Sequence, residues 1–165
     1  MRQGREAFLL WLGLFLVWVL ITWSAQAQEL LTGAAITLVL TLLLRSVYPL
    51  LSGIQPGIKP FFFMVVYVFI FIWQLILANI DVAKRVLSPR MPISPGIVKV
   101  KTKLKSPLAK MMLTSSITLT PGTLSLDVQG DEIFIHWIDV KGKDVATATD
   151  AIVSVFEKGL KEVVE

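Results

Sequence analysis

His136 is the only histidine in the chain and the side chain best suited to acid–base or metal chemistry. The segment from Ile133 to Asp139 alternates in residue type, which places Phe134, His136 and Ile138 on one face of a predicted strand. A metal site or a general base needs convergent partners, and none shares this spacing. We therefore predict a structural or interaction role for His136, and catalysis is the third alternative.

Other titratable side chains sit near predicted strands. Asp127 and Asp139 lie near strand ends, where solvated carboxylates beside turns are common. From residue 97 to 105, apolar and basic residues alternate strictly, which predicts a half-buried strand with lysines on its second face. The row consists of Lys99, Lys101, Lys103 and Lys105. It is either a solvated face or a contact for anionic headgroups or an acidic partner.

Enzyme signatures are missing from the sequence. There is no cysteine, no G-x-G-x-x-G, no P-loop and no Ser/His/Asp arrangement. We predict no enzymatic activity, no cofactor, no bound metal and no small-molecule substrate of the chain's own. The net charge of +4 does not indicate nucleic acid, because the lysines follow the last apolar segment and no RNA-binding aromatic pattern accompanies them.

The charge distribution divides the 165 residues into two parts. Charged residues are 17% of the chain and apolar residues 55%, whereas soluble domains carry roughly 25% charged residues. Between Ala7 and Asn79 the only charged residues are Glu29, Arg45 and Lys59. From residue 81 onward charges are frequent. This pattern predicts a membrane-embedded part followed by a water-exposed part.

Three apolar segments make up the membrane-embedded part: 7–23, 30–44 and 61–80. A helical span needs about 20 apolar residues at 1.5 Å each, so the third segment suffices and the first suffices with little tilt. The second is short, unless it extends through Arg45 to Leu51 with the arginine snorkelling to the interface. The sequence thus predicts two to three transmembrane helices.

The first segment also resembles a signal peptide, since Arg2 and Arg5 precede it and Ala25-Gln26-Ala27 resembles a cleavage site. It is longer than a usual signal core and contains three tryptophans, so we interpret it as a retained membrane helix. Eight basic residues between positions 84 and 110 follow the third segment, which predicts a cytoplasmic C-terminal domain. Three full spans would leave both N-terminal arginines outside, against the positive-inside rule. A second segment that enters without crossing would place both ends inside.

The middle of each apolar segment lacks Asp, Glu, Lys, Arg and His, the residues that mark ion and proton pathways in membranes. Gln74 is the most polar side chain deep in the third segment, and an interhelical hydrogen bond is its expected role. The chain by itself is therefore a poor candidate for a conducting element. It is better interpreted as part of a transporter.

The water-exposed part is predicted to be a small α/β domain. We divide the chain into a transmembrane helical region over 1–87, a proline-rich connector over 88–96 and a domain over 97–165. The domain has strand patterns at 97–105, 123–128 and 133–140, a helix at 108–117 capped by Ser106, and an amphipathic helix at 144–165. The order β-α-β-β-α predicts a small antiparallel or mixed sheet with helices on one face.

Several strings in the sequence resemble the E subunit of Mrp-type (multiple resistance and pH) sodium/proton antiporters. They are the runs 75–83 and 135–140, Pro95-Gly96, and Ser115-Ser116-Ile117-Thr118-Leu119-Thr120-Pro121-Gly122-Thr123, which is the most specific. The resemblance covers nearly the whole chain. It implies an accessory subunit that supports assembly and ion transport in a cell-membrane complex, while other subunits carry the ions. The same family occurs in the antiporter module of archaeal membrane-bound hydrogenase-type complexes, which is one alternative; a stand-alone membrane-tethered regulatory module is another.

The expected functional residues follow from both arguments. The resemblance implies a structural motif at the sheet, which consists of Thr118, Thr120, Pro121, Gly122 and Thr123. Possible interaction residues are Asn79 and Asp81 at the membrane edge, the four lysines of the row, and His136. Asp81 precedes Arg85 by four positions, a spacing that predicts an ion pair on one helical face. The expected partners are other membrane subunits of an antiporter or hydrogenase-type complex and membrane lipid.

Overall fold

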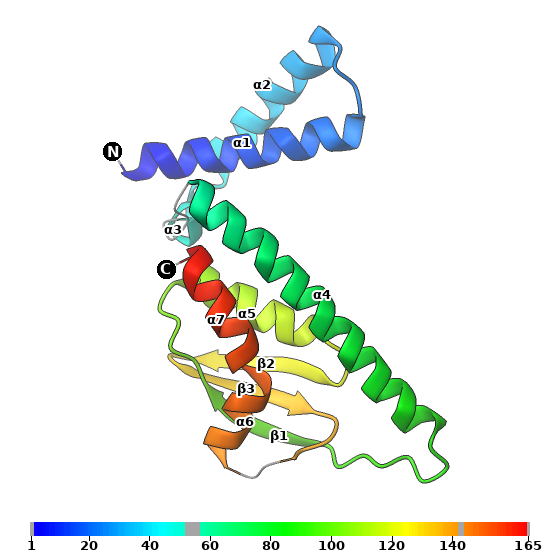
Figure 1. Cartoon of the computed structure of the whole chain (residues 1–165). Helices are drawn as coiled ribbons and strands as arrows, with labels where there is room; N and C mark the ends of the chain where they lie inside the picture. The colour runs from blue at the N-terminus through cyan, green and yellow to red at the C-terminus, as the bar shows by residue number, and fades with distance from the viewer. Residues whose placement is uncertain (1, 52–56, 142–143, 165) are drawn as a thin grey trace. The chain divides into compact units, whose positions relative to one another are not determined.

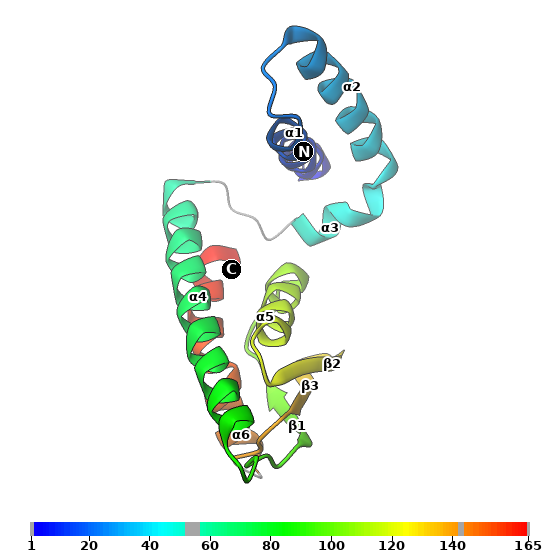
Figure 2. The same ribbon diagram turned by 90° about the vertical axis from the view of Figure 1, so that its right-hand side faces the viewer.

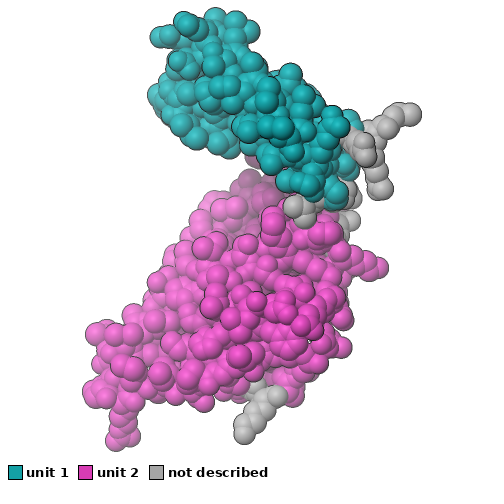
Figure 3. Space-filling model, turned by 180° about the vertical axis from the view of Figure 1, so that it is seen from behind, with its two compact units in different colours: residues 1–52 teal, residues 53–165 magenta. Residues whose placement is uncertain are grey.

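The computed structural model describes residues 2–51, 57–141 and 144–164. Residues 52–56 of the expected membrane region, and 142–143 and 165 of the expected domain, lie outside the described residues. The chain divides into two compact units, which Figure 3 colours separately: unit 1 over 1–52 and unit 2 over 53–165.

Unit 1 is a hairpin of two apolar helices, α1 (Arg2–Thr22) and α2 (Ala27–Leu43), followed by the 3-10 turn η1 (Arg45–Val47) and the short helix α3 (Tyr48–Leu51) (Figure 1). The first two expected apolar segments fall within or beside α1 and α2. The helices run antiparallel, because the indole of Trp18 donates to the carbonyl of Glu29 at 3.2 Å and that of Trp11 donates to Ala34 at 3.3 Å.

Close contact in this hairpin depends on a glycine. A Cβ added at Gly33 would lie 2.3 Å from the Trp18 ring, so only glycine lets the indole approach the backbone of α2. On the same helix, the buried hydroxyls of Thr37 and Thr41 donate to the carbonyls four residues earlier at 2.7 and 2.8 Å. These threonines bury a polar atom without leaving it unpaired.

Unit 2 begins with the long helix α4 (Ile58–Leu87). It ends at Ser88-Pro89 as expected, since the residue before a proline disfavours helical geometry. The following elements are β1 (Gly96–Lys101), α5 (Pro107–Leu119), β2 (Thr123–Gln129), β3 (Glu132–Trp137), α6 (Val145–Ile152) and α7 (Ser154–Val164). The Ser106 hydroxyl accepts from the Ala109 amide, which confirms the expected cap of α5.

The strands form a three-stranded antiparallel sheet in the order β1-β3-β2, and β2 is irregular between Ser125 and Asp127. The expected first strand over 97–105 is too long, because β1 ends at Lys101, opposite the first residue of β3. Thr102 then donates its amide to Asp131 and its hydroxyl to Glu157. The expected buried face still holds: Val98, Val100, Thr102 and Leu104 are all buried.

The expected single C-terminal helix is wrong, because α6 and α7 are separate helices that meet at Val153. The Thr149 hydroxyl donates to the carbonyl of Val145, four residues earlier, and accepts from the Lys101 amide. Ser154 likewise bonds back to Asp150. Such side-chain bonds to preceding carbonyls bend helices. The break allows α6 to cover the edge of β1 and α7 to pack on α4.

The core of unit 2 has three layers: the sheet, the helices α5 and α7, and α4 on the far side of those helices (Figure 2). Its fully buried side chains come from the strands and the helices alike: Val100, Leu113, Ile117, Ile133, Ile135, Val153 and Leu160. Tyr67, in α4, belongs to the same cluster. The compact unit therefore starts earlier than residue 97, while the membrane boundary at 87 remains a prediction.

Candidate functional site at the end of α4

The expected Thr-Pro-Gly-Thr motif closes α5 and opens β2. The Thr120 hydroxyl donates to the carbonyl of Ile117 at 2.7 Å, and the Thr123 hydroxyl donates to the same carbonyl at 2.6 Å. The two hydroxyls lie 3.1 Å apart. Thr118 accepts from the Ser125 amide at 3.1 Å, which ties the helix to the strand. Thr120 and Thr123 therefore satisfy a carbonyl at the end of α5, and Thr118 satisfies an amide of β2.

The glycine of this motif has a steric reason. Gly122 has φ of +91°, which favours glycine, and its carbonyl accepts from the Ile138 amide at 2.8 Å. A Cβ added there would lie 2.9 Å from Ile138 and 3.6 Å from Val82 of α4. The turn at Pro121-Gly122 thus fits between the end of β3 and the C-terminal part of α4.

Arg85 holds the same end of α4 to the sheet. Its guanidinium contacts both carboxylate oxygens of Asp81, at 2.8 and 3.2 Å, which confirms the expected i,i+4 pair. It also contacts Asp139, which follows β3, at 2.9 Å, and donates to the carbonyl of Pro92 at 2.6 Å. We call these four groups the Arg85 junction. One guanidinium binds two carboxylates and a carbonyl from three segments: α4, the connector and the residues after β3. The junction therefore holds these segments together rather than performing chemistry.

The lysine row is not one continuous face. Lys99 pairs with Glu132 at 3.0 Å and Lys101 approaches the same oxygen at 3.9 Å. Lys103 and Lys105 lie beyond the end of β1. His136 is exposed on the sheet, in register with Ile97 and Leu124. The structure therefore does not bring His136 and the four lysines to one site.

Asn79 also stays apart from the other expected residues. Its side-chain amide donates to the carbonyl of Leu75 on its own helix at 2.8 Å. Four residues separate these groups along the helix, so this bond is local. The role of Asn79 as an interaction residue remains a prediction.

Three features were missed by the sequence reasoning. Trp11 and Trp18 bind backbone carbonyls of α2, although they were predicted only as apolar residues. Glu6, in the first turns of α1, is only 6% exposed. The Tyr67 hydroxyl hydrogen-bonds to Ser116, 49 residues away. A tyrosine in an otherwise apolar helix is the one signal that could have identified this last contact.

The electrostatics of the water-exposed part include one perturbed carboxyl. Asp144 precedes α6, and hydrogen bonds from the side chain and the backbone of Thr147 lower its pKa below the usual range. The bond from the Thr147 amide is 3.0 Å long, typical of a helix cap. This carboxylate therefore stabilises the helix start in its charged form.

Within the described residues, no group of three or more His, Asp or Glu side chains could hold a metal. A hollow of about 440 Å³ lies between α5 and the edge strand β2 and is lined by Thr118, Leu119, Ser125 and Asp127, among others. Its polar groups are mainly hydroxyls, with one carboxylate. The motif at 118–123 and the Arg85 junction are therefore suited to holding α4, α5 and the sheet together.

Two helices, Gly4–Thr22 and Ile58–Leu87, are long and apolar enough to cross a membrane. Together with the exposed apolar side chains of the α1–α2 hairpin, they are typical of a membrane protein, here with a small α/β unit. A family model described as Na+/H+ ion antiporter subunit matches residues 11–163. The chain belongs to this family.

Relatives in other organisms agree with the family. The E subunit of the Na(+)/H(+) antiporter of Alkalihalophilus pseudofirmus is 51% identical over 96 residues, which is 57% of this chain. The match spans only 60% of that relative's length. The E1 subunit of the Na(+)/H(+) antiporter of Staphylococcus haemolyticus is 36% identical over 90% of this chain and 91% of its own.

A solved structure is similar along nearly the whole chain. It is a chain of the membrane-bound sulfane sulfur reductase, described as an archaeal respiratory membrane complex. The identity is 42% and the TM-score 0.83, over 96% of this chain and 98% of that one. The folds are therefore closely alike.

Proposed function

We propose that this chain is an accessory subunit of a multi-subunit sodium/proton antiporter, which supports assembly and transport without conducting ions itself. The observation that carries the proposal is the placement of charge on the apolar helices. In α1 and α2, as far as they are described, charged side chains occur only near the helix starts. In α4 they are Lys59 at the start and Asp81, Lys84 and Arg85 near the end. Ion pathways need titratable or charged groups inside the membrane.

The proposed location is the cell membrane, with more than one crossing and the C-terminal domain on the cytoplasmic side. The eight basic residues between positions 84 and 110 support this side. The partners are other membrane subunits and lipid. The Arg85 junction would then keep the end of α4 aligned with the sheet.

A second candidate is the same subunit within the antiporter module of a redox-driven membrane complex. The 42% identity to a chain of the sulfane sulfur reductase complex favours it. Both candidates assign the chain the same accessory role, and they differ in the energy source of the whole complex.

The test is pH-dependent antiport in vesicles, normalised to assembled complex. Asp81→Asn removes one carboxylate of the Arg85 junction, and Glu6→Gln removes the buried carboxylate of α1. An accessory role predicts an unchanged pH profile for both variants. The Asp81 side chain is 52% exposed, and Arg85 keeps Asp139 and the Pro92 carbonyl as partners, so complex yield should fall only slightly in Asp81→Asn.

Arg85→Ala is the assembly control for this test. It leaves Asp139 without its 2.9 Å partner, so we expect less assembled complex but the same pH profile in what remains. A large activity loss or a shifted profile in Asp81→Asn or Glu6→Gln at full assembly would place this chain on the ion route. Native mass measurement after mild extraction tests the partners, because a chain that purifies alone would be a stand-alone module.

A further inference from the structure

Helix α4 is packed along one side from its start to its end. Lys59 lies 3.9 Å from Glu162 of α7, and Arg85 lies 2.9 Å from Asp139 near the sheet. Between these ends, Tyr67 is 5% exposed in the core of unit 2. The partly buried side chains that pack on this core from the same helix are Phe63, Met64 and Phe71. The helix has 30 residues, about 45 Å, and these contacts are spread along it from Lys59 to Arg85.

Helix α7, which packs against α4, also carries exposed charged side chains. Helix α7 contacts α4 through Gly159, where a Cβ would lie 2.8 Å from Tyr67, and through the ring of Phe156. The next residues on α7 include Lys158, Lys161 and Glu162, which carry charge at or near the surface. A helix that crosses a bilayer would bring these charges into the hydrocarbon with it, which is strongly unfavourable.

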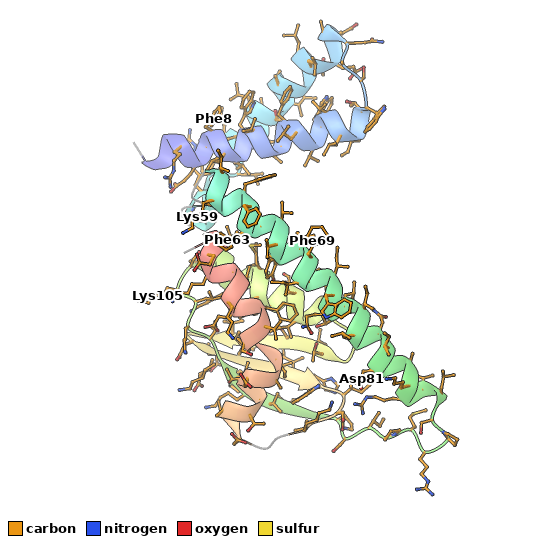
Figure 4. The ribbon with its side chains drawn as sticks, in the orientation of Figure 1. Phe8, Lys59, Phe63, Phe69, Asp81 and Lys105 are labelled. Carbon is orange, nitrogen blue, oxygen red and sulfur yellow. The ribbon has the colours of Figure 1, made fainter. Side chains whose placement is uncertain are left out.

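The opposite side of α4, its outer face, is almost entirely apolar (Figure 4). Phe63 points toward the domain and Phe69 away from it. The outer face consists of Phe61, Phe62, Val65, Val66, Val68, Phe69, Ile72, Trp73, Ile76, Leu77 and Ile80, each between 36 and 70% exposed. Branched and aromatic side chains without a small residue among them suit acyl chains, since close helix–helix packing in membranes uses Gly, Ala and Ser.

We propose that α4 lies in the plane of the membrane, with its outer face in one leaflet and the rest of unit 2 on the aqueous side. The occupant of the outer face is lipid. Charge complementarity supports this, because exposed cations flank the apolar stretch: Lys59 before it, and Lys84 and Arg90 after it. Anionic headgroups attract such cations at the rim of an interfacial helix.

Three full spans would place Arg2 and Arg5 outside, against the positive-inside rule, and an in-plane α4 avoids this. The crossings are then α1 and the shorter α2, whose 17 residues lie at the lower end of the range for a span. Their antiparallel hairpin returns the chain to the side on which it started. Arg2, Arg5, Arg45 and Lys59 fall on one side together with the basic residues after α4, and Glu29 lies near the other side. That distribution obeys the positive-inside rule. The cytoplasmic identity of the side rests on the proposed function, whereas the in-plane helix does not.

Because the chain has no cysteine, the depth of α4 can be mapped with single introduced cysteines. Spin labels are placed on the outer face at Phe62, Phe69, Trp73, Ile76 and Ile80, in complex reconstituted into vesicles that contain anionic lipid. An in-plane helix predicts nearly equal depths at all five positions. A crossing helix would change depth by about 5.4 Å per turn, roughly 27 Å from the first label to the last. A difference of more than two turns, about 11 Å, overturns the inference.

The matched control is α1, labelled at Phe8, Leu12, Leu16 and Leu20, which should show the graded profile of a crossing helix. Sidedness gives a second measurement. Ile58→Cys, Lys158→Cys and Ser24→Cys are treated with an impermeant maleimide before and after permeabilisation. Ile58 and Lys158 should react on the same side and Ser24 on the other. Opposite sides for Ile58 and Lys158 overturn the inference. If both react in intact cells, the in-plane helix stands and the proposed cytoplasmic domain fails.

Discussion

The two units of this chain bury their side chains in different ways. Among the described residues, the buried hydrophobic core has 16 members, and all of them lie in unit 2, where strands and helices interlock. In the described part of unit 1 the buried positions are Glu6, Gly33, Thr37 and Thr41, while apolar side chains such as Leu20 and Ile21 are 67 and 78% exposed. Unit 1 is held by indole-to-carbonyl hydrogen bonds and one close backbone approach.

This difference reflects two solvents. In water, burying large apolar side chains in a core is favourable, because it removes apolar surface from the solvent. In lipid that driving force between helices is absent, so small residues and hydrogen bonds hold helices together. Unit 1 follows the second set of rules and unit 2 the first. Helix α4 combines them, with one face in the core of unit 2 and the other exposed.

The largest expected effect is in the core of unit 2. Tyr67→Ala removes a buried ring and should lower the free energy of unfolding by about 3–5 kcal/mol, as for other large aromatic truncations. Tyr67→Phe keeps the ring and loses only the hydrogen bond to Ser116, at a cost of about 0.5–1.5 kcal/mol. Denaturant unfolding of the purified complex, monitored on this subunit, measures both. Equal effects of the two variants would mean that α4 is not part of the core.

A smaller effect is expected in unit 1. Gly33→Ala places a methyl group against the Trp18 ring, and overpacking of this kind costs about 1–3 kcal/mol. Gly13→Ala on α1 is the matched control, because nothing lies within 4 Å of the added atom. Thermal unfolding and the yield of the chain in the membrane are the measurements. If Gly13→Ala were as harmful as Gly33→Ala, the close approach of α1 and α2 would not hold the hairpin.

The smallest effect concerns pH and is confined to unit 2. The lowered pKa of Asp144 means that the folded state binds its proton less readily than the unfolded chain. Its contribution to stability is therefore present above the ordinary carboxyl pKa and is lost as the pH falls through the lower, folded pKa. Asp144→Asn caps the helix without titrating. Between about pH 5 and pH 3, the melting temperature of the unmodified chain should fall slightly more than that of Asp144→Asn.

Much of the fold follows from local patterns in the sequence. The alternation at 97–105 predicts which side chains β1 and the following residues bury, and Val98, Val100, Thr102 and Leu104 are all buried. The Ser88-Pro89 stop and the Ser106 cap are also local signals, as is the Asp81–Arg85 spacing. The strings at 75–83, 95–96, 115–123 and 135–140 predicted the family, and the family model matches residues 11–163.

Tertiary structure alone decided the features that join distant residues. The end of β1 at Lys101 depends on where β3 begins, and the break at Val153 depends on the separate partners of α6 and α7. The pairing of Arg85 with Asp139 spans 54 positions, and no spacing rule reaches that far.

The clearest case is the third apolar segment. The sequence alone predicts a long apolar helix here, because the apolar run and the Ser88-Pro89 stop are properties of neighbouring residues. Which side of that helix meets protein was decided by Tyr67, Gly159 and Ser116 coming together in space. A sequence pattern records what each residue can pack against, and only the folded chain selects the neighbour that occupies the space.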